Sequence, residues 1–416
     1  MAWLSVPHPR LSWSDALARV ADAVALVCLH TPDGDTLLAF APEVRALRGW
    51  DDLAALTARA ADDAPTAPPT TPGWHAHGPG WVVQLDYEFP AAAGVAWRCA
   101  AYARWSASGA CTLHATDAAS LARLDAALDQ PALACPTPTL TAALTPAWTA
   151  AEHGAQVERI RAWIAAGDIY QASLTLPVTS RLARSPNPDV GLFLALATQS
   201  PAPYAALLRA PGRPSVVSNS PECFLRQRGS AVWSEPIKGT RRRIPGAEIA
   251  TRAHLLGSAK DRAELAMIVD LVRNDLGRVA VPGSVHVEAA AAVMDLPYVH
   301  HLVARVGARL RPETGFADAV RAAFPAGSIT GAPKIRAMQI IAALEAGPRG
   351  AYCGTFGWIG AQHADLAVTI RTLTIADDRV RLHAGGGIIA DSDGAAEWDE
   401  VRAKAAAMAA ALGGTL

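Results

Sequence analysis

The chain has 416 residues, of which 51% are hydrophobic, so it can bury a substantial core in one very large domain or in two to three ordinary ones. Its 37 Lys and Arg nearly balance 38 Asp and Glu, and a net charge of -1 argues against a nucleic-acid or membrane-surface partner. The 6 cysteines form no CxxC pair, which is typical of reduced thiols and not of a disulfide scaffold.

The start of the sequence lacks a basic segment followed by a long apolar run, so we expect no secretion signal. No stretch approaches the roughly 18 uncharged apolar residues that a membrane span needs. A cytoplasmic protein is therefore the expectation.

Apolar runs interrupted by turn signals occupy the first 145 residues. Apolar or alternating patterns predict strands within residues 21–29, 81–89 and 95–105. Prolines and glycines predict an irregular loop over residues 62–80. Residues 130–148 are the best candidate for a linker or a long crossing connection.

Stronger periodic patterns begin near residue 150. Apolar residues at helical spacing, with matching start and stop signals, predict helices within residues 151–166, 263–277, 328–347 and 394–412. Alternation predicts consecutive antiparallel strands over residues 351–360, 366–375 and 379–388. Helices and hairpin-linked strands mix without a regular βαβ alternation, so the sequence favours an α+β fold.

Two pairs of carboxylates stand three residues apart on predicted helices. Asp261 and Glu264 share one helix face, and Glu397 and Glu400 share another. Facing each other, the two pairs would form an all-oxygen cage that suits Mg²⁺. The alternative is two solvated helix faces, in which Glu400 pairs with Lys404.

Two segments could hold an anion. Gly385, Gly386 and Gly387 are consecutive near a predicted strand end, where free backbone N–H groups could converge on a carboxylate. Thr330 is a candidate N-cap, and a helix N-terminus favours an anion. Arg371 interrupts an apolar, threonine-rich strand pattern, which suggests a buried partner or a bound carboxylate. An ordinary turn and an ordinary cap are the alternatives for the first two.

Three further polar side chains stand in unusual positions. Lys238, in "PIKGT", lies between a Pro-Ile pair and a Gly-Thr turn, where packing has little use for a lysine. Glu222 follows a Ser-Pro turn and precedes an apolar pair, so it could point into a cleft. His301 lies just before an apolar run, where a structural histidine is the commoner outcome. Together the candidates suit a small substrate with more than one carboxylate.

Nine stretches appear in an order that resembles the chorismate-utilising enzymes: "GDIYQASLT", "SPECF", "PIKGT", "AKDRAELAMIVDLVRNDLGRVA", "VHHLV", "FPAGSITGAPKIRAM", "YCGTFGW", "IRTLTI" and "AGGGIIADSD…AEWDE". The resemblance implies one large unit, with two antiparallel sheets packed face to face and helices outside. Residues 146–416 would form the chorismate-binding catalytic region. Residues 1–145 match weakly and would be interwoven with it.

Within this family, a lysine at position 238 is typical of the branch that converts chorismate to 4-amino-4-deoxychorismate. The resemblance implies that the Lys238 amine attacks ring carbon 2 and expels the carbon-4 hydroxyl, after which ammonia enters at carbon 4 and expels the lysine. For that role the amine must lose its proton, which desolvation or nearby cations would favour. Glu222 would protonate the departing hydroxyl.

The resemblance assigns roles to the other candidates as well. Mg²⁺ would bind the ring carboxylate, held by Glu264 with Glu397 or Glu400, and assisted by Asp261 through water. The substrate contacts would come from Thr330, Arg371, Gly385, Gly386, Gly387, His301 and Trp358. At position 358 the family commonly places tyrosine, so Trp358 could reshape the pocket wall.

The resemblance also implies partners. No glutaminase segment is apparent, so a glutamine amidotransferase subunit would deliver ammonia, and a separate aminodeoxychorismate lyase would form p-aminobenzoate for folate. Pro203 and Tyr204 match half of a tryptophan pocket found in the family. The alternative functions are an anthranilate synthase component I, an isochorismate or salicylate synthase that uses a lysine as base, and a non-catalytic chorismate- or tryptophan-binding protein.

Overall fold

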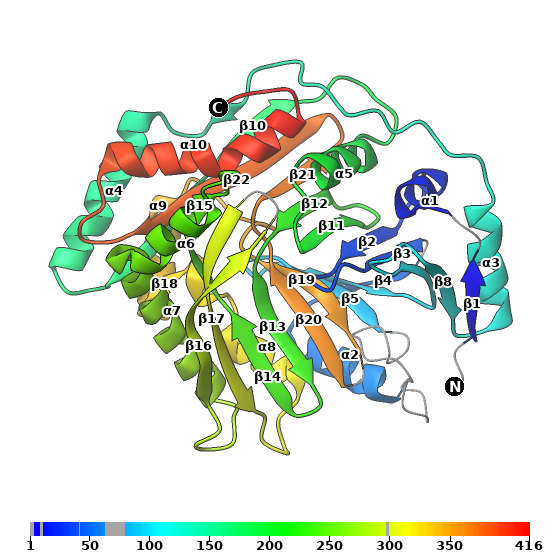
Figure 1. The fold of residues 1–416 in the computed structure, drawn as a ribbon, viewed down its shortest axis with the longest axis horizontal. Coiled ribbons are helices and arrows are strands. Elements are labelled where there is room, and N and C mark those ends of the chain that lie inside the picture. The colour runs from blue at the N-terminus through cyan, green and yellow to red at the C-terminus, as the bar shows by residue number, and fades with distance from the viewer. Residues whose placement is uncertain (1–3, 9–10, 41, 63–79, 297–298, 361) are drawn as a thin grey trace.

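Two large antiparallel sheets form the framework of this chain in a computed structural model that describes residues 4–8, 11–40, 42–62, 80–296, 299–360 and 362–416 (Figure 1). Residues 63–79, most of the loop expected from the sequence, lie outside the described residues.

The larger sheet is 12-stranded. Its order is β1 (Leu4–His8), β8 (Cys111–Ala115), β7 (Ala101–Trp105), β3 (Thr36–Phe40), β2 (Leu26–His30), β11 (Tyr204–Arg209), β12 (Ser215–Ser220), β21 (Thr372–Ala376), β22 (Arg379–Ile388), β10 (Gln171–Arg181) and β18 (Gly331–Ala332), with β9 (Thr145–Pro146) paired to β10.

The smaller sheet is 10-stranded. Its order is β15 (Ile237–Arg242), β17 (Val299–Arg309), β14 (Ala231–Glu235), β13 (Cys223–Arg228), β20 (His363–Val368), β19 (Thr355–Ile359), β5 (Trp81–Leu85), β6 (Gly94–Arg98) and β4 (Glu43–Leu47), with β16 (His286–Asp295) paired to β17.

The two sheets pack face to face through one apolar layer. It joins Val27 and Leu208 of the larger sheet to Val82 and Phe356 of the smaller one. Helices cover the outer faces, and in Figure 1 α10 lies along β22. Outside the larger sheet are α1 (Trp13–Arg19), α3 (Ala118–Leu128), α4 (Ala150–Ala165), α5 (Pro188–Gln199), α9 (Lys334–Leu344) and α10 (Gly394–Ala411). Outside the smaller sheet are α2 (Trp50–Asp62), α6 (Glu248–Gly257), α7 (Ala259–Gly277) and α8 (Phe316–Ala323). The predicted α+β fold is confirmed.

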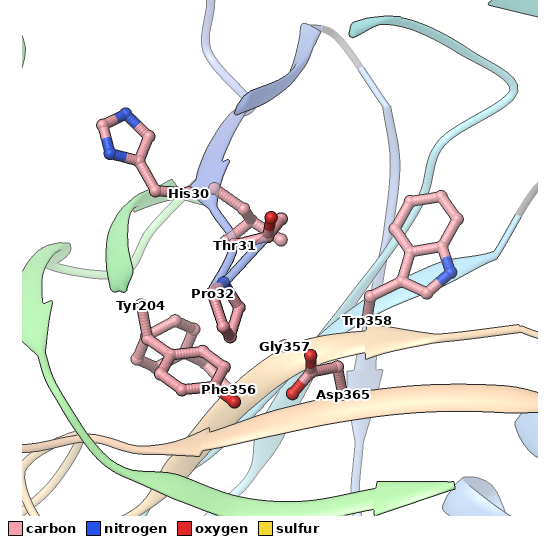
Figure 2. A pocket seen from close by; sticks show the side chains of 9 residues that line it. His30, Thr31, Pro32, Tyr204, Phe356, Gly357, Trp358 and Asp365 are labelled. Atoms are coloured by element: carbon pink, nitrogen blue, oxygen red, sulfur yellow. The ribbon is translucent and has the colours of Figure 1, made fainter. Parts of the chain in front are cut away.

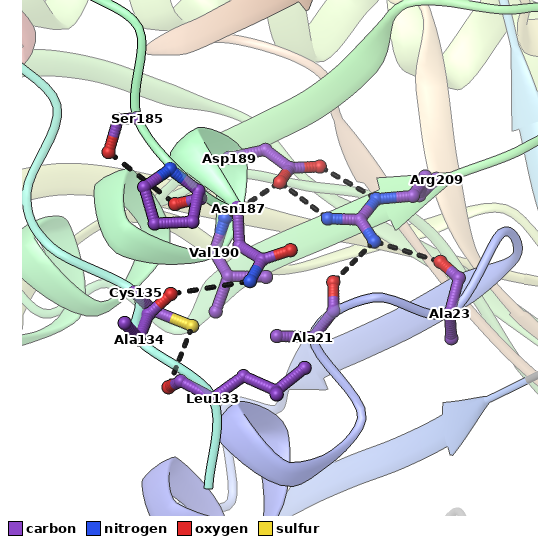
Figure 3. Close-up of polar contacts among 11 residues, drawn as sticks. Ala21, Ala23, Leu133, Ala134, Cys135, Ser185, Asn187, Asp189, Val190 and Arg209 are labelled. Atoms are coloured by element: carbon purple, nitrogen blue, oxygen red, sulfur yellow. Dashed lines mark hydrogen bonds and ion pairs between the residues drawn. The ribbon is translucent and has the colours of Figure 1, made fainter.

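The first 145 residues contribute strands to both sheets. Strand β2 pairs with β11, and β5 pairs with β19. Figure 3 shows one link between the two parts of the chain: the guanidinium of Arg209 pairs with Asp189 and donates to the carbonyls of Ala21 and Ala23 at 2.7 and 2.8 Å. A buried guanidinium whose donors are satisfied in this way fixes the chain entering β2 against α5.

Local signals explain where α4 begins and ends. Thr149 is its N-cap and forms a capping box with Glu152, in which each side chain accepts from the other residue's backbone N–H. The helix ends before Gly167, whose φ of +82° few other residues adopt at low cost. The helix predicted over residues 151–166 is thereby confirmed.

One strand predicted from the sequence is two strands in the structure. Residues 366–375 were expected to form a single strand, but β20 ends at Val368 in the smaller sheet and β21 begins at Thr372 in the larger one. Arg371 lies in the crossing between the sheets with φ +49°, a left-handed conformation that breaks strand geometry. An alternating pattern cannot reveal this crossing, because it reads the same in one strand or two.

Candidate active site

A bulge in an edge strand turns Lys238 inward. Gly239 follows it with φ +71°, and the pairing register between β15 and β17 shifts between Lys238 and Thr240. The Lys238 side chain is 13% exposed, and its Nζ lies 3.7 Å from Oε2 of Glu264 on α7. The structure therefore holds this lysine against a carboxylate and largely away from water.

Glu222 immediately precedes β13 and is 4% exposed. Its Oε1 accepts a hydrogen bond of 2.5 Å from the hydroxyl of Ser328, which belongs to the short 3-10 helix Gly327–Ile329. Burial raises the pKa of Glu222 to about 7, although Ser328, Lys238 and Arg371 oppose the rise. A carboxyl group with a pKa near neutrality can both give and take a proton at physiological pH.

The three consecutive glycines lie in the last part of strand β22, which ends at Ile388, so the strand predicted over residues 379–388 is confirmed. Gly385, Gly386 and Gly387 pair with β10 on one side. On the other side, the pairing of β22 with β21 ends at Leu382. Beyond Leu382 this edge of β22 has no strand partner in the part of the chain that the structure describes. The glycines therefore do offer one unpaired backbone edge, as an anion cradle requires.

The missing side chains of two glycines bring the charged groups together. A Cβ on Gly386 would lie 3.0 Å from Oε1 of Glu400 and 3.2 Å from Oε2 of Glu397. A Cβ on Gly387 would lie 3.3 Å from Nζ of Lys238 and only 2.6 Å from the side-chain nitrogen of Gln171. Glu397 and Glu400 of α10 thus lie on one side of β22 and Lys238 of β15 on the other, and only the glycine backbone stands between them.

Gln171 is a site residue that the sequence analysis missed. It is fully buried at the start of β10, and neither atom of its amide has a hydrogen-bond partner within the described residues. Burying an amide without a partner is costly, so the Gln171 amide is available to hydrogen-bond a bound ligand or water. Gln171 carries no charge and sits in an alternating strand, which is why its pattern attracted no attention.

The acidic residues only partly form the predicted cage. Glu397 is buried in the first turn of α10, where it accepts 2.6 Å from the Ser392 hydroxyl, and Glu400 is exposed and paired with Lys404. Burial and the nearby Glu400 charge raise the pKa of Glu397, while the Ser392 hydrogen bond opposes them. Glu264 lies between Lys238 and Lys260.

Asp261 does not join this group in the described structure. It accepts a hydrogen bond of 2.8 Å from Arg241, so its charge is already compensated. Across the described ranges, no three His, Cys, Asp or Glu side chains converge into a ready-made metal cage. The remaining set still fits Mg²⁺, because this ion needs only one or two carboxylates and keeps several waters.

Lysine charges surround the carboxylates that would hold the cation. Burial raises the pKa of Glu400, but the ammonium groups of Lys404, Lys238 and Lys260 prevail and lower it. These lysine charges compensate carboxylates that otherwise repel one another.

Arg371 and His301 lie close to Glu222 and to one another. Burial lowers the pKa of Arg371, and the charge of Glu222 acts in the opposite sense. His301 is 1% exposed on β17, where its Nδ1 lies 2.9 Å from the hydroxyl oxygen of Thr240. Burial, and then Arg371, lower the pKa of His301 to about 4, so its imidazole is neutral at physiological pH.

Helix α9 begins about one turn later than the sequence predicts, so Thr330 lies in the turn before it. The N-cap of α9 is Pro333, so the prediction that Thr330 caps this helix is wrong. Its hydroxyl donates 3.0 Å to the carbonyl of Ala326, and its own carbonyl accepts from Ser173 of β10. The early proline fixes the extended residue before the helix, and the threonine instead closes the 3-10 turn.

Trp358 does not line the site around Lys238, so its predicted place in the substrate pocket wall is wrong. It is 1% exposed on β19, between the sheets, with its ring 5.7 Å from that of Tyr102 on β7. Figure 2 shows it lining a different cavity together with Tyr204 and Asp365. Alternate residues of a strand point to opposite faces, and position 358 faces the inter-sheet layer.

The Tyr204 cavity has a volume of about 20 Å³, enough for about one water molecule. Pro203 immediately precedes Tyr204 and does not line it. A tryptophan ligand here stays a prediction, and binding it would require the cavity to open.

In the described parts of the chain, none of the helices combines the length and the apolar character needed to cross a membrane.

Comparison with known proteins identifies a family. The profile of the family described as "chorismate binding enzyme" matches residues 61–410. The chain is 44% identical over 267 residues to the aminodeoxychorismate synthase component 1 of Klebsiella aerogenes, covering 62% of this chain and 58% of that protein. It is 41% identical over 308 residues to the anthranilate synthase component 1 of Streptomyces coelicolor, covering 71% of this chain and 60% of that protein. The chain thus spans less than two thirds of the length of either relative.

A solved structure of similar fold is the menaquinone-specific isochorismate synthase of Escherichia coli. It superposes with a TM-score of 0.80 at 19% identity, over 99% of this chain and 94% of that one.

Proposed function

Since this chain belongs to the family of chorismate binding enzymes, we propose that it converts chorismate to 4-amino-4-deoxychorismate with Lys238 as nucleophile. One observation carries the proposal: a largely buried lysine lies among Glu264, Gln171 and Gly387, near a carboxyl group whose pKa is about 7. The similarity to the aminodeoxychorismate synthase component 1 of Klebsiella aerogenes supports it.

The first half-reaction needs a nucleophile and an acid. The neutral amine of Lys238 attacks ring carbon 2 and loses a proton, the ring double bond shifts, and the carbon-4 hydroxyl leaves as water with a proton from Glu222. In the second half-reaction ammonia bonds to carbon 4 and gives up a proton, the double bond shifts back, and the Lys238 nitrogen takes up a proton and departs from carbon 2 as the neutral amine. Glu222 suits the acid role because its pKa of about 7 keeps part of it protonated at neutral pH.

The carboxylates of the substrate need positive or hydrogen-bonding partners. Arg371 and the unpaired backbone edge at Gly385 to Gly387 would bind one carboxylate. Glu264, Glu397 and Glu400 would hold Mg²⁺, which would neutralise the charge of the other carboxylate and orient the ring. We leave Asp261 out of this set because Arg241 already compensates it. The neutral imidazole of His301 would contact the substrate without transferring a proton.

Ammonia would come from a glutamine amidotransferase subunit. A separate aminodeoxychorismate lyase would consume the product to form p-aminobenzoate, and both steps would take place in the cytoplasm. These partners rest on the family resemblance and on the similarity to proteins named as component 1.

The test mixes the purified chain with chorismate, Mg²⁺ and an ammonium salt, and identifies the product by mass spectrometry beside the Lys238→Ala variant. We expect 4-amino-4-deoxychorismate from the wild type and at least a thousandfold lower rate from the variant, because the nucleophile is absent. Lys260→Ala, which removes a lysine contacting the same Glu264 but placed on α7, is the matched control.

Other products would point elsewhere. Anthranilate, formed at an unchanged rate by Lys238→Ala, would favour the second candidate suggested by the Streptomyces coelicolor relative. Isochorismate would show that the lysine acts on water. If no product forms even with an amidotransferase added, a binding protein becomes the better account.

A further inference from the structure

A second cavity lies between the two sheets and has a volume of about 150 Å³. Gln84 of β5 lines it from the smaller sheet, and Arg381 and His383 of β22 line it from the larger one. Neither Lys238 nor Glu222 takes part in its wall. The cavity is therefore separate from the candidate active site, although both are bordered by the same strand.

One face of β22 borders both the second cavity and the candidate active site. Residues two apart on a strand share a face, so Arg381 and His383 project on the same side as Gly385 and Gly387. The side chains at the first two positions line the cavity, and the glycine at position 387 faces Lys238. The cavity thus lies behind the candidate active site along the strand.

His383 reaches this cavity with unused hydrogen-bonding capacity. It is 5% exposed, and neither ring nitrogen has a hydrogen-bond partner in the described ranges. Its ring stacks on Tyr352, with centroids 5.0 Å apart and planes at 22°, which fixes its orientation. Burial, followed by the charges of Arg381 and Arg349, lowers the pKa of His383 to about 3, so one nitrogen of the neutral ring is a donor.

Arg381 is the second group with an unused donor. One terminal nitrogen donates 2.9 Å to the carbonyl of Pro348, whereas its buried Nε has no partner among the residues that the structure describes. Burial lowers the pKa of Arg381, and the more distant charge of Glu88 only opposes this effect. When burial costs a guanidinium more than nearby carboxylates restore, binding an anion becomes favourable.

The carboxylates around the cavity are committed to other groups. Asp86 binds Arg213 at 2.7 Å and accepts 2.8 Å from Gln84. Glu345 forms an ion pair of 2.7 Å with Arg349. Arg381 has no carboxylate of its own within ion-pair distance in the described residues.

We propose that this cavity binds a small carboxylate or inorganic oxyanion, held by Nε of Arg381 and by the N–H of His383. Its volume, about that of a cavity that admits one benzene ring, accommodates acetate or phosphate. The half-buried guanidinium of Arg381 has no carboxylate counter-ion among the described residues, and a bound anion would compensate its charge.

The test measures the melting temperature of the purified chain while sodium acetate or sodium phosphate replaces sodium chloride at constant ionic strength. A specific anion raises the melting temperature along a saturable curve, because it binds only the folded state. We expect saturation for the wild type. In Arg381→Gln and in His383→Phe, which keeps the stack on Tyr352, the half-saturating concentration rises about tenfold or more.

Two controls separate this site from others. Arg379→Gln removes the same charge from an exposed position on the same strand and should keep the wild-type curve. Lys238→Met alters the candidate active site and should keep it too. Saturation with acetate alone identifies a carboxylate site, and saturation with phosphate alone identifies an oxyanion site.

Two results would overturn the proposal. One is a response without saturation that is equal in all variants, since it would be a general salt effect on a water-filled cavity. The other is a saturable response that disappears in Lys238→Met and persists in Arg381→Gln, since the anion would then occupy the candidate active site.

Discussion

Two buried carboxyl groups at neighbouring strands of the smaller sheet, one just before β13 and one on β20, have opposite surroundings. Glu222, immediately before β13, accepts from the neutral hydroxyl of Ser328 and has no ion pair within the described residues. Asp365, on β20, instead lies 3.0 Å from the guanidinium of Arg226. Burial raises the pKa of both groups, to about 7 and about 6, and the Arg226 charge opposes the rise at Asp365. The Arg226 charge holds Asp365 in its ionised form, whereas the neutral Ser328 hydroxyl leaves Glu222 able to exchange a proton. Burial alone therefore does not mark the reactive group.

Of the tests of this comparison, the largest effect is expected from replacing the carboxyl group of Glu222. Glu222→Gln keeps the size of the side chain but cannot donate a proton to the leaving hydroxyl, so we expect kcat to fall by roughly 10²–10⁴-fold. Steady-state kinetics with chorismate and ammonium measures this fall.

Asp365→Asn is the matched control for that variant. It makes the same chemical change next to Arg226, leaves the buried guanidinium uncompensated, and should lower the melting temperature with kcat nearly unchanged. A similar loss of kcat in both variants would remove the distinction between the two carboxyl groups.

The pH dependence of the reaction sharpens the comparison. The acid form of Glu222 is required, so kcat should fall about tenfold per pH unit above its pKa of about 7. The same raised pKa contributes stability that is present below about pH 4.5, the ordinary value, and is lost as the pH rises through about 7. A pH profile of kcat checks the first statement, and Glu222→Gln should abolish the limb. A rate that is flat from pH 6 to 9 would contradict the assignment.

A smaller effect is expected where the backbone approaches the lysine. In Gly387→Ala the new Cβ would lie 2.6 Å from the side-chain nitrogen of Gln171, so both Gln171 and Lys238 must shift. We expect kcat/KM to fall about tenfold, by analogy with other displacements of a positioned group. Gly277→Ala, at the end of α7 where no atom lies within 4 Å of the new Cβ, should keep the wild-type value.

The smallest effect on catalysis is expected from Trp358→Phe. This ring packs between the sheets and away from Lys238, so the substitution should change kcat and KM less than twofold. The smaller ring leaves a void, and the free energy of unfolding should fall by about 1–3 kcal/mol in denaturant titrations. A marked rise in KM for chorismate would return Trp358 to the substrate pocket.

The sequence was most informative where one element decides the geometry. The carboxylates three residues apart on α7 and α10, and the capped start of α4, follow from helix periodicity and capping. Lys238 was found because a charged residue between turn residues is conspicuous. The division of the chain at residue 145 stays a prediction, although β2 and β5 pair with strands beyond it.

The sequence could not predict where the chain changes from one sheet to the other, or which side chains meet between the sheets. Nothing in the alternation of residues 366–375 reveals that the chain changes sheets at Arg371. The face to which Trp358 points likewise depends on how β19 pairs with β5 and β20. Gln171 escaped notice because an uncharged amide in a strand becomes unusual only when its neighbours are known.

The crossing at Arg371 has a consequence for folding. Lys238 and Glu222 belong to the smaller sheet, Gln171 and the glycines of β22 to the larger one, and the crossing chain holds the arginine that acts on Glu222. Neither sheet alone contains the whole set, so the candidate active site is complete only when both sheets are folded and packed together. Hydrogen exchange and recovery of activity after refolding should therefore report the same event.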